Sequence, residues 1–318
     1  MNPIIEPGLS AEARAFLATF IPDETPTDFS RITQIRKEVR ALQAAAAERA
    51  IERHGLIRED VVLGGIECER VVARRGNTSG GKLVYLFGGS FIVGCPHSDM
   101  PIIGALVEEC HVEVIAPKYR LAPEHPAPSA ANDCVAVWQA VSQSWSGPLL
   151  LAGESAGGNL ALVLVQRALA EDLRIPDAMA LLSPAVDLRT DLELFEPTTY
   201  ADPTLIPGRM AEILANYGSG RDPTDPSLSP IFGPLANLPP TIITTGSRDL
   251  LLSTCLRFYR QLKRAGVDVE CRVWDGLWHV FEYYDQYPEA AESLHEIATF
   301  LNAKVDSTAI GNSIKSNV

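Results

Sequence analysis

The stretch LLLAGESAGGNLALVLV, residues 149–165, decides the fold. An apolar run of strand length ends at Gly153, Ser155 follows two residues later, and a Leu-, Ala- and Val-rich stretch of helical type begins after Gly158. Residues 153–157 therefore read G-x-S-x-G between a strand and a helix, which is the context of a nucleophile elbow. Glycines permit the sharp turn, and the helix N-terminus stabilises negative charge near the hydroxyl. An ordinary Gly-rich turn is the alternative interpretation.

Strand-like and helix-like segments alternate along most of the chain. Apolar strand segments are predicted at 82–89, 111–117, 148–153, 178–184, 241–246 and 268–274, and helices at 9–22, 29–53, 128–144, 157–171, 253–266 and 288–303. Buried strands that alternate with helices indicate an α/β fold with a mostly parallel central sheet and helices on both faces. A pair of antiparallel-looking strands near residues 60–74 is expected at one edge of that sheet.

The organisation predicts one catalytic domain with two additions. Residues 1–50 are expected to form an N-terminal helical cap segment, and residues 51–305 the catalytic domain. An insertion at about 187–216, rich in Pro, Asp and Thr, interrupts the alternation and is predicted to cover the pocket, because long insertions between strands are usually functional. Residues 306–318 form a polar tail that is expected to be frayed.

Composition excludes several classes of function. The formal net charge of −13 argues against nucleic-acid binding, because an acidic surface repels phosphates. No membrane-spanning stretch and no signal peptide is found, so a cytoplasmic location is expected. The six cysteines are scattered without a C-x-x-C pair, which predicts buried free thiols and no metal site.

A serine nucleophile needs a base and an orienting carboxylate. Of the six histidines, His279 directly follows the last predicted strand and is the best candidate base; His97 is less favourable because it comes early in the chain. Asp249 also follows a strand directly, whereas Asp275 lies too near His279 and Asp187 opens the insertion. Ser155, Asp249 and His279 then occur in the chain order nucleophile, acid, base, which is the order in α/β-hydrolases.

Acyl transfer also requires backbone N–H groups that face the oxyanion. The residue after the nucleophile, Ala156, supplies one. The glycine-rich loop within residues 83–94, with Gly88, Gly89 and Ser90, is expected to supply the others.

With these motifs the chain resembles the hormone-sensitive-lipase-like esterases, bacterial family IV, of the α/β-hydrolase fold. The family's H-G-G-G motif aligns with residues 87–90, its G-D-S-A-G-G with residues 153–158, and YRLAPEHPAP at 119–128 and AGVDVE at 265–270 are similar to further family signatures. The resemblance runs from about residue 70 to 303 and implies a helical cap. It also implies that Gly89 and Ser90 present N–H groups to the oxyanion together with Ala156.

The chain departs from the family pattern at several positions. Phe87 replaces the motif histidine, Ser90 replaces its last glycine, and Glu154 replaces the usual aspartate. Ser253 stands where an acidic residue is common. Val280 replaces the glycine that often follows the catalytic histidine. The bulky ring of Trp278, beside His279, is expected to limit the length of the acyl chain in the pocket. These changes affect the expected catalytic strength and substrate shape, and leave the reaction class unchanged.

The sequence therefore predicts a serine hydrolase that cleaves carboxylic esters of short to medium acyl chains through an acyl-enzyme, without a cofactor or metal. A small-molecule ester is the expected partner; a homodimer stays open. Lactone or amide hydrolysis with the same triad is one alternative. A non-catalytic small-molecule binder on the same fold is another, as in the plant gibberellin receptors, which resemble the family and lack the catalytic histidine.

Overall fold

The computed structural model describes residues 8–20, 25–76, 81–190 and 202–315, without the side chains of 306–315. One sheet of eight strands forms its centre, in the order β1-β2-β4-β3-β5-β6-β7-β8. The strands are β1 Leu56–Leu63, β2 Ile66–Ala73, β3 Lys82–Leu86, β4 Glu113–Pro117, β5 Leu149–Glu154, β6 Ala178–Leu182, β7 Thr241–Gly246 and β8 Val269–Trp274. Only β2 runs antiparallel to its neighbours, so the predicted parallel sheet with an antiparallel pair at one edge is confirmed.

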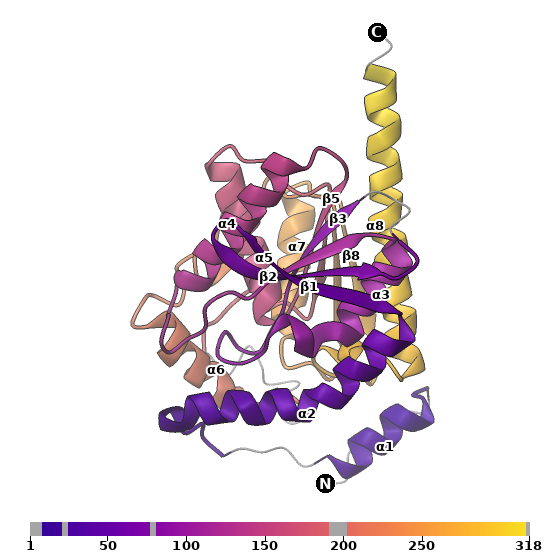
Figure 1. The fold of residues 1–318 in the computed structure, drawn as a ribbon. Coiled ribbons are helices and arrows are strands. Elements are labelled where there is room, and N and C mark those ends of the chain that lie inside the picture. Colours follow the sequence, from indigo (N-terminus) through magenta and orange to yellow (C-terminus); the bar gives the residue numbers. More distant parts are fainter. Residues whose placement is uncertain (1–7, 21–24, 77–80, 191–201, 316–318) are drawn as a thin grey trace.

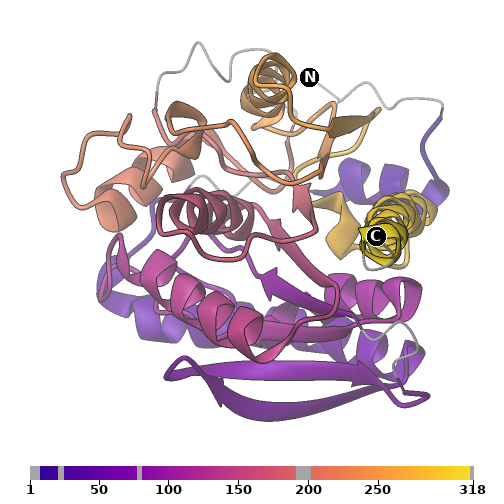
Figure 2. The same ribbon diagram turned by 90° about the horizontal axis from the view of Figure 1, so that it is seen from above.

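Helices cover both faces of this sheet (Figure 1). The helices are α1 Ala11–Thr19, α2 Ile32–Arg53, α3 Met100–Cys110, α4 Ser129–Ser144, α5 Ala156–Ala170, α6 Pro207–Ile213, α7 Leu252–Arg264 and α8 Pro288–Lys315, with short helical turns at 29–31, 96–99, 214–218, 230–232 and 281–283. Helix α3 packs against α8, and α4 packs against α5, on opposite sides of the strands (Figure 2).

The apolar runs of the sequence form the centre of the sheet because helices cover them from both sides. Every residue of β5, β6 and β7 is buried. Buried apolar area is the main stabilising contribution to such a sheet. The edge strand β1 is largely exposed. The buried strands β5 and β7 lead into the candidate site at their carboxyl ends, as does the edge strand β8.

Helices α1, α2 and α6 lie together at one end of the molecule (Figure 1). The N-terminal helices form close to where the sequence places them. Their part of the predicted segment 1–50 is described except for residues 1–7 and 21–24. Of the predicted insertion at about 187–216, residues 191–201 lie outside the described residues.

The last helix is longer than predicted. We expected it to end near residue 303 and the tail from 306 to be frayed, but α8 continues to Lys315 and projects beyond the body of the molecule (Figure 1). Polar residues by themselves do not end a helix, and the stretch contains no proline that would.

Candidate active site

Ser155 sits on a strained turn between β5 and α5. Its backbone has φ 51° and ψ −116°, in a region that residues other than glycine rarely adopt. A Cβ atom at Gly153 would collide with the carbonyl of Gly157, and one at Gly157 would collide with the carbonyl of Leu86. Both glycines of the pentapeptide are therefore required for backbone to pass backbone, which is the geometry of a nucleophile elbow.

The three residues of the predicted triad lie together at the carboxyl ends of β5, β7 and β8. His279 Nε2 is 2.9 Å from Ser155 Oγ, and His279 Nδ1 is 3.0 Å from Asp249 Oδ1. Both distances are those of hydrogen bonds. An uninterrupted chain of contacts thus joins a hydroxyl, an imidazole and a carboxylate, which is the arrangement that activates a serine.

Asp249 is fully buried and surrounded by donors. Oδ1 accepts the backbone N–H of Leu251 at 2.8 Å, and Oδ2 accepts the hydroxyl of Thr245 at 2.8 Å. Burial opposes its charge, but the charge of His279 and hydrogen bonds from His279, Ser183 and Leu251 outweigh it and hold the pKa of Asp249 below its usual value. The carboxylate is therefore ionised when it faces the imidazole.

The pKa of His279 changes in the opposite direction. Burial disfavours the imidazolium, but Asp249, through its charge and its hydrogen bond, and then Asp202 and Glu154 favour it more strongly, and together they raise the pKa of His279 to about 9. The site is thus built to stabilise a positively charged imidazole.

The glycine-rich loop after β3 lies beside the elbow. The N–H of Gly88 donates to the buried carboxyl groups of Asp99 and Glu154. The following residues Gly89, Ser90 and Phe91 all have positive φ, at 103°, 60° and 61°. The amides of Gly89 and Ser90 thus lie on a sharp turn beside the elbow.

A family model described as alpha/beta hydrolase fold matches residues 83–283. An esterase from Acinetobacter venetianus is 31% identical over 242 residues, which cover 75% of this chain and 79% of that protein. The chain belongs to the α/β-hydrolase family. The crystal structure of EstE5 soaked with p-nitrophenyl butyrate is 27% identical to this chain, with a TM-score of 0.84. The match covers 93% of this chain and 97% of EstE5. A hormone-sensitive lipase from a metagenome library is 29% identical, with a TM-score of 0.78. The match covers 90% of this chain and 93% of that lipase. The chain is thus a hormone-sensitive-lipase-like member of the family.

The structure explains how this α/β-hydrolase replaces the motif histidine with Phe87. The Phe87 ring is 2% exposed and stacks on Tyr119, with 4.0 Å between ring centroids and planes 7° apart. Tyr119, from the YRLAPEHPAP segment, also donates its hydroxyl to the Phe87 carbonyl at 2.5 Å. Ring stacking and one hydroxyl donor therefore anchor the loop where the family uses an imidazole.

The two departures beside His279 also have a structural explanation. Val280 has φ 50°, a conformation that favours glycine, and its N–H is held by the hydroxyl of Ser183 at 3.1 Å. Trp278 is fully buried and stacks on Phe16 of α1 at 4.6 Å. The expectation that Trp278 restricts the pocket beside His279 is therefore wrong, because its ring faces the N-terminal helix.

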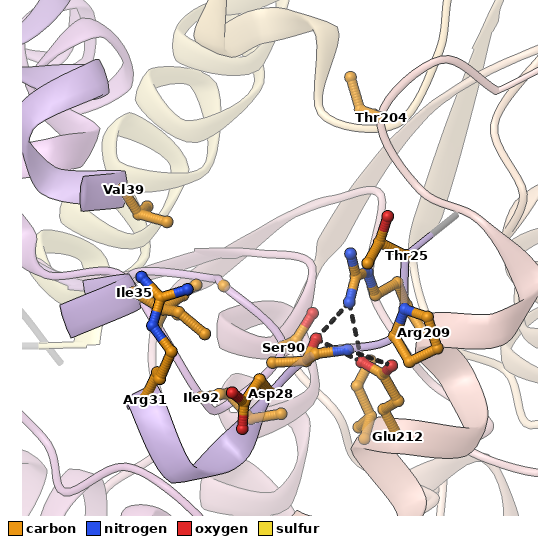
Figure 3. Close-up of a pocket in the computed structure, with 15 residues that line it drawn as sticks. Thr25, Asp28, Arg31, Ile35, Val39, Ser90, Ile92, Thr204, Arg209 and Glu212 are labelled. Atoms are coloured by element: carbon orange, nitrogen blue, oxygen red, sulfur yellow. Dashed lines mark hydrogen bonds and ion pairs between the residues drawn. The ribbon is translucent and has the colours of Figure 1, made fainter. Parts of the chain in front are cut away.

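A pocket of about 590 Å³ opens next to the glycine-rich loop. The glycine-rich loop, the N-terminal segment and the insertion with α6 each line it. The lining residues are Gly89, Ser90, Ile92 and Val93 from the loop, Thr25, Pro26, Thr27, Asp28, Arg31, Ile35 and Val39 from the N-terminal segment, and Thr204, Arg209, Glu212 and Ile213 from the insertion and α6. Figure 3 shows Ser90 between Arg31 and Ile35 on one side and Arg209 and Glu212 on the other. Charged and apolar groups thus share its walls.

The N-terminal segment and the insertion are joined at this pocket. Arg209 donates to Glu212 at 2.9 Å and to the hydroxyl of Thr27, and the N–H of Thr27 donates to Glu212 at 2.8 Å. Both predicted covering segments therefore meet over the glycine-rich loop.

The other candidate residues lie in separate structural contacts. Asp187 pairs with Arg189 at 2.8 Å, Asp275 accepts the hydroxyl of Ser247 at 3.0 Å, and His97 lies 3.5 Å from Glu48. None of these contacts includes Ser155.

Sequence reasoning missed one carboxylate, Asp202. In the part of the chain that the structure describes, Asp202, Asp249 and His279 are the one group of three His, Cys, Asp or Glu side chains close enough to share an ion. Asp249 and His279 are bonded to each other, and Asp202 accepts four hydrogen bonds from protein groups, three of them from backbone N–H. No motif in the sequence marks Asp202.

Among the described residues, no helix combines the length and the apolar character needed to cross a membrane.

Proposed function

We propose that this carboxylic ester hydrolase uses Ser155 as its nucleophile, His279 as its general base and acid, and Asp249 as the carboxylate that orients His279. The observation that carries the proposal is the chain of two hydrogen bonds, 2.9 and 3.0 Å long, from Ser155 through His279 to Asp249. Ser155 Oγ attacks the ester carbonyl while His279 Nε2 takes its proton. His279 then protonates the leaving alcohol, and the acyl-enzyme remains. A water molecule attacks the acyl group while His279 takes its proton, and His279 returns this proton to Ser155 as the acid leaves.

The negative oxygen of the tetrahedral intermediate needs fixed donors. We assign that role to the N–H groups of Gly89, Ser90 and Ala156. Ala156 is the first residue of α5, so its amide also lies at the positive end of a helix. Gly88, whose own N–H is held by Asp99 and Glu154, fixes the start of the loop. The names of the relatives, an esterase and an acetyl-hydrolase from Streptomyces hygroscopicus, support an ester of a small acid as the substrate. The cytoplasmic location and the homodimer stay predictions.

Covalent labelling tests the nucleophile directly. A fluorophosphonate ester should inactivate the enzyme with one adduct per chain, and peptide mass mapping should place this adduct on Ser155. Inclusion of a short acyl ester should slow the labelling, because both compete for the same hydroxyl. Inactivation with the adduct on another residue, or full activity after complete labelling of Ser155, would refute the assignment.

The raised pKa of His279 predicts an alkaline pH dependence. His279 accepts the serine proton only when it is neutral, and a pKa of about 9 keeps it mostly protonated at neutral pH. Therefore kcat/KM should rise with pH. The midpoint of its acidic limb should lie between pH 6.5, the ordinary pKa of histidine, and about pH 9. The profile of kcat/KM for a p-nitrophenyl ester measures this limb, and a limb at or below the ordinary value contradicts the prediction.

The pocket walls predict a preference for short acyl chains. Arg31, Asp28, Arg209 and Glu212 line the space beside Ser90, and a long alkyl chain would take water from these groups without replacing its hydrogen bonds. We expect kcat/KM to be about tenfold or more higher for a four-carbon than for a sixteen-carbon p-nitrophenyl ester, both below their aggregation limits. Equal or faster turnover of the longer ester would contradict this.

Arg36 of α2 predicts that the N-terminal segment supports the glycine-rich loop. Its guanidinium donates to the carbonyls of Ile92 and Ala122, both at 2.7 Å, and to both carboxylate oxygens of Glu124. Because Ile92 lies two residues after Ser90, Arg36→Ala should loosen the loop and lower kcat/KM by about tenfold, with a smaller change in melting temperature. Lys37→Ala, at the next and exposed position of the helix, is the matched control. If the two variants have equal kcat/KM, the N-terminal segment does not support the glycine-rich loop.

A further inference from the structure

Asp202 is a buried carboxylate beside the triad that the proposed mechanism leaves unused. Its side chain is 2% exposed, and it comes from the insertion between β6 and α6. A carboxylate in such a place costs free energy unless donors surround it. Its contacts therefore indicate why the chain keeps it there.

Four donors hold the Asp202 carboxylate. Oδ1 accepts the N–H of Thr204 at 2.8 Å, the hydroxyl of Thr204 at 3.0 Å and the N–H of Leu205 at 3.1 Å. Oδ2 accepts the N–H of Leu250 at 2.9 Å. Burial and the charge of Asp249 raise the pKa of Asp202 to about 6, whereas His279 and the backbone donors oppose this. Asp202 is therefore ionised at the alkaline pH at which His279 becomes neutral.

One helix end holds both carboxylates. The N–H groups of two consecutive residues, Leu250 and Leu251, donate to Asp202 and Asp249 respectively, directly before α7 begins at Leu252. The positive end of the α7 dipole stabilises negative charge at this point. The loop that carries the triad acid is thus fixed to the insertion by the amide next to it.

The same segment reaches the loop of His279. The hydroxyl of Thr204, which contacts Asp202, lies 3.3 Å from the carbonyl oxygen of His279. Carboxylate oxygens of Asp202 and Asp249 and a ring nitrogen of His279 all lie within 4.8 Å of one another. The charged groups that act on the imidazole are Asp249 from the β7–α7 loop, Asp202 from the insertion and Glu154 from the end of β5. The charge of Asp249 acts on buried Glu282, three residues after His279, and the charge of Glu282 acts on Glu154.

We propose that Asp202 is a positioning residue of the catalytic site: it fixes the Asp249 and His279 loops against the insertion and supplies a second negative charge to the imidazolium that forms during acyl transfer. The inference rests on the proposed triad. It gives the insertion a role in the chemistry as well as in covering the pocket, because Thr204 both contacts Asp202 and lines the pocket.

Asp202→Asn removes the charge and keeps the size of the side chain. We expect the acidic limb of kcat/KM to move down by about one pH unit, because a negative charge that close to the imidazole is lost. We also expect kcat on the alkaline plateau to fall by about tenfold, which is the rate equivalent of one unit of lost imidazolium stabilisation. A purely structural role would lower the melting temperature and leave the limb where it is.

Asp133→Asn is the matched control. Asp133 is 3% exposed, is held by Arg120 at 2.7 Å, and is not among the groups that act on His279. It should lower stability without a shift of the limb. A folded Asp202→Asn protein with the wild-type limb and plateau would overturn the inference, as would an equal shift in Asp133→Asn.

Two further variants keep the inference testable. If Asp202→Asn does not fold, Thr204→Val decides, because it removes the hydroxyl shared by Asp202 and His279: a kcat several-fold lower at unchanged KM supports the role, and unchanged kcat overturns it. Ser155→Ala separates this inference from the proposed function. Turnover that survives Ser155→Ala refutes the triad itself, whereas loss of turnover in Ser155→Ala with no effect of Asp202→Asn refutes the role of Asp202 alone.

Discussion

Ser155→Ala is expected to lower kcat for a short acyl ester by about 10⁴- to 10⁶-fold. The hydroxyl on the elbow is the group that His279 contacts at 2.9 Å, and alanine leaves nothing that can form an acyl-enzyme. The fold should persist, because the strained φ of 51° is imposed by the glycines on either side and by the strand and helix that flank the turn. Steady-state turnover of p-nitrophenyl butyrate, with thermal melting as the test of folding, measures both expectations.

The double variant Ser155→Ala with His279→Ala provides the control. When two residues act as one unit, the loss of either removes most of the contribution of both. Each single variant and the double variant should therefore have a similar residual rate. A residual rate that falls multiplicatively would mean that the two residues act independently. Retention of most of the activity in Ser155→Ala, after removal of contaminating esterases, would contradict the mechanism.

Gly89→Ala is expected to lower kcat by about 10²- to 10³-fold, the usual loss for one oxyanion donor. Gly89 has φ 103°, and a Cβ atom there would collide with the carbonyl of Val93, so the turn that aims the amides of Gly89 and Ser90 must open. Kinetics with a p-nitrophenyl ester measure the loss, and KM should change less than kcat because the donors matter most in the transition state.

Two variants separate this loss from general strain. Gly65→Ala, in the β1–β2 turn, has φ 80° and open space at the Cβ position, so it carries backbone strain without a collision and should leave kcat unchanged. Ser90→Ala keeps its backbone N–H and should cost less than about tenfold. If a folded Gly89→Ala enzyme has near-normal kcat, the loop does not supply oxyanion donors. Proline at position 90 is a poor probe, because φ is 60° there and proline requires about −65°.

The sequence by itself determined most of the elements and their order, because those signals are local. Helix α3, Met100–Cys110, was not predicted, because it is buried on nearly every side and its sequence shows no amphipathic pattern. The apolar runs that became β5, β6 and β7 are fully buried. Of the two glycines around Ser155, Gly153 must clear the backbone of Gly157, and Gly157 must clear the backbone of Leu86 on β3. Asp249 and His279 could be selected because each directly follows a strand, and the carboxyl ends of parallel strands share one edge of a sheet. Chain order then predicted their meeting without knowledge of any side-chain direction.

Only the tertiary structure decided what surrounds these residues. Trp278 adjoins His279 in sequence, yet its ring packs on Phe16, because neighbouring residues of a loop point in different directions. Phe87 is anchored by Tyr119, which lies on a different segment. Asp202 has no motif, and it reaches the triad because the insertion folds back onto the residues directly before α7. Such contacts join segments far apart in the chain, and their geometry is set by the packing of the whole fold, which local periodicity and spacing do not contain.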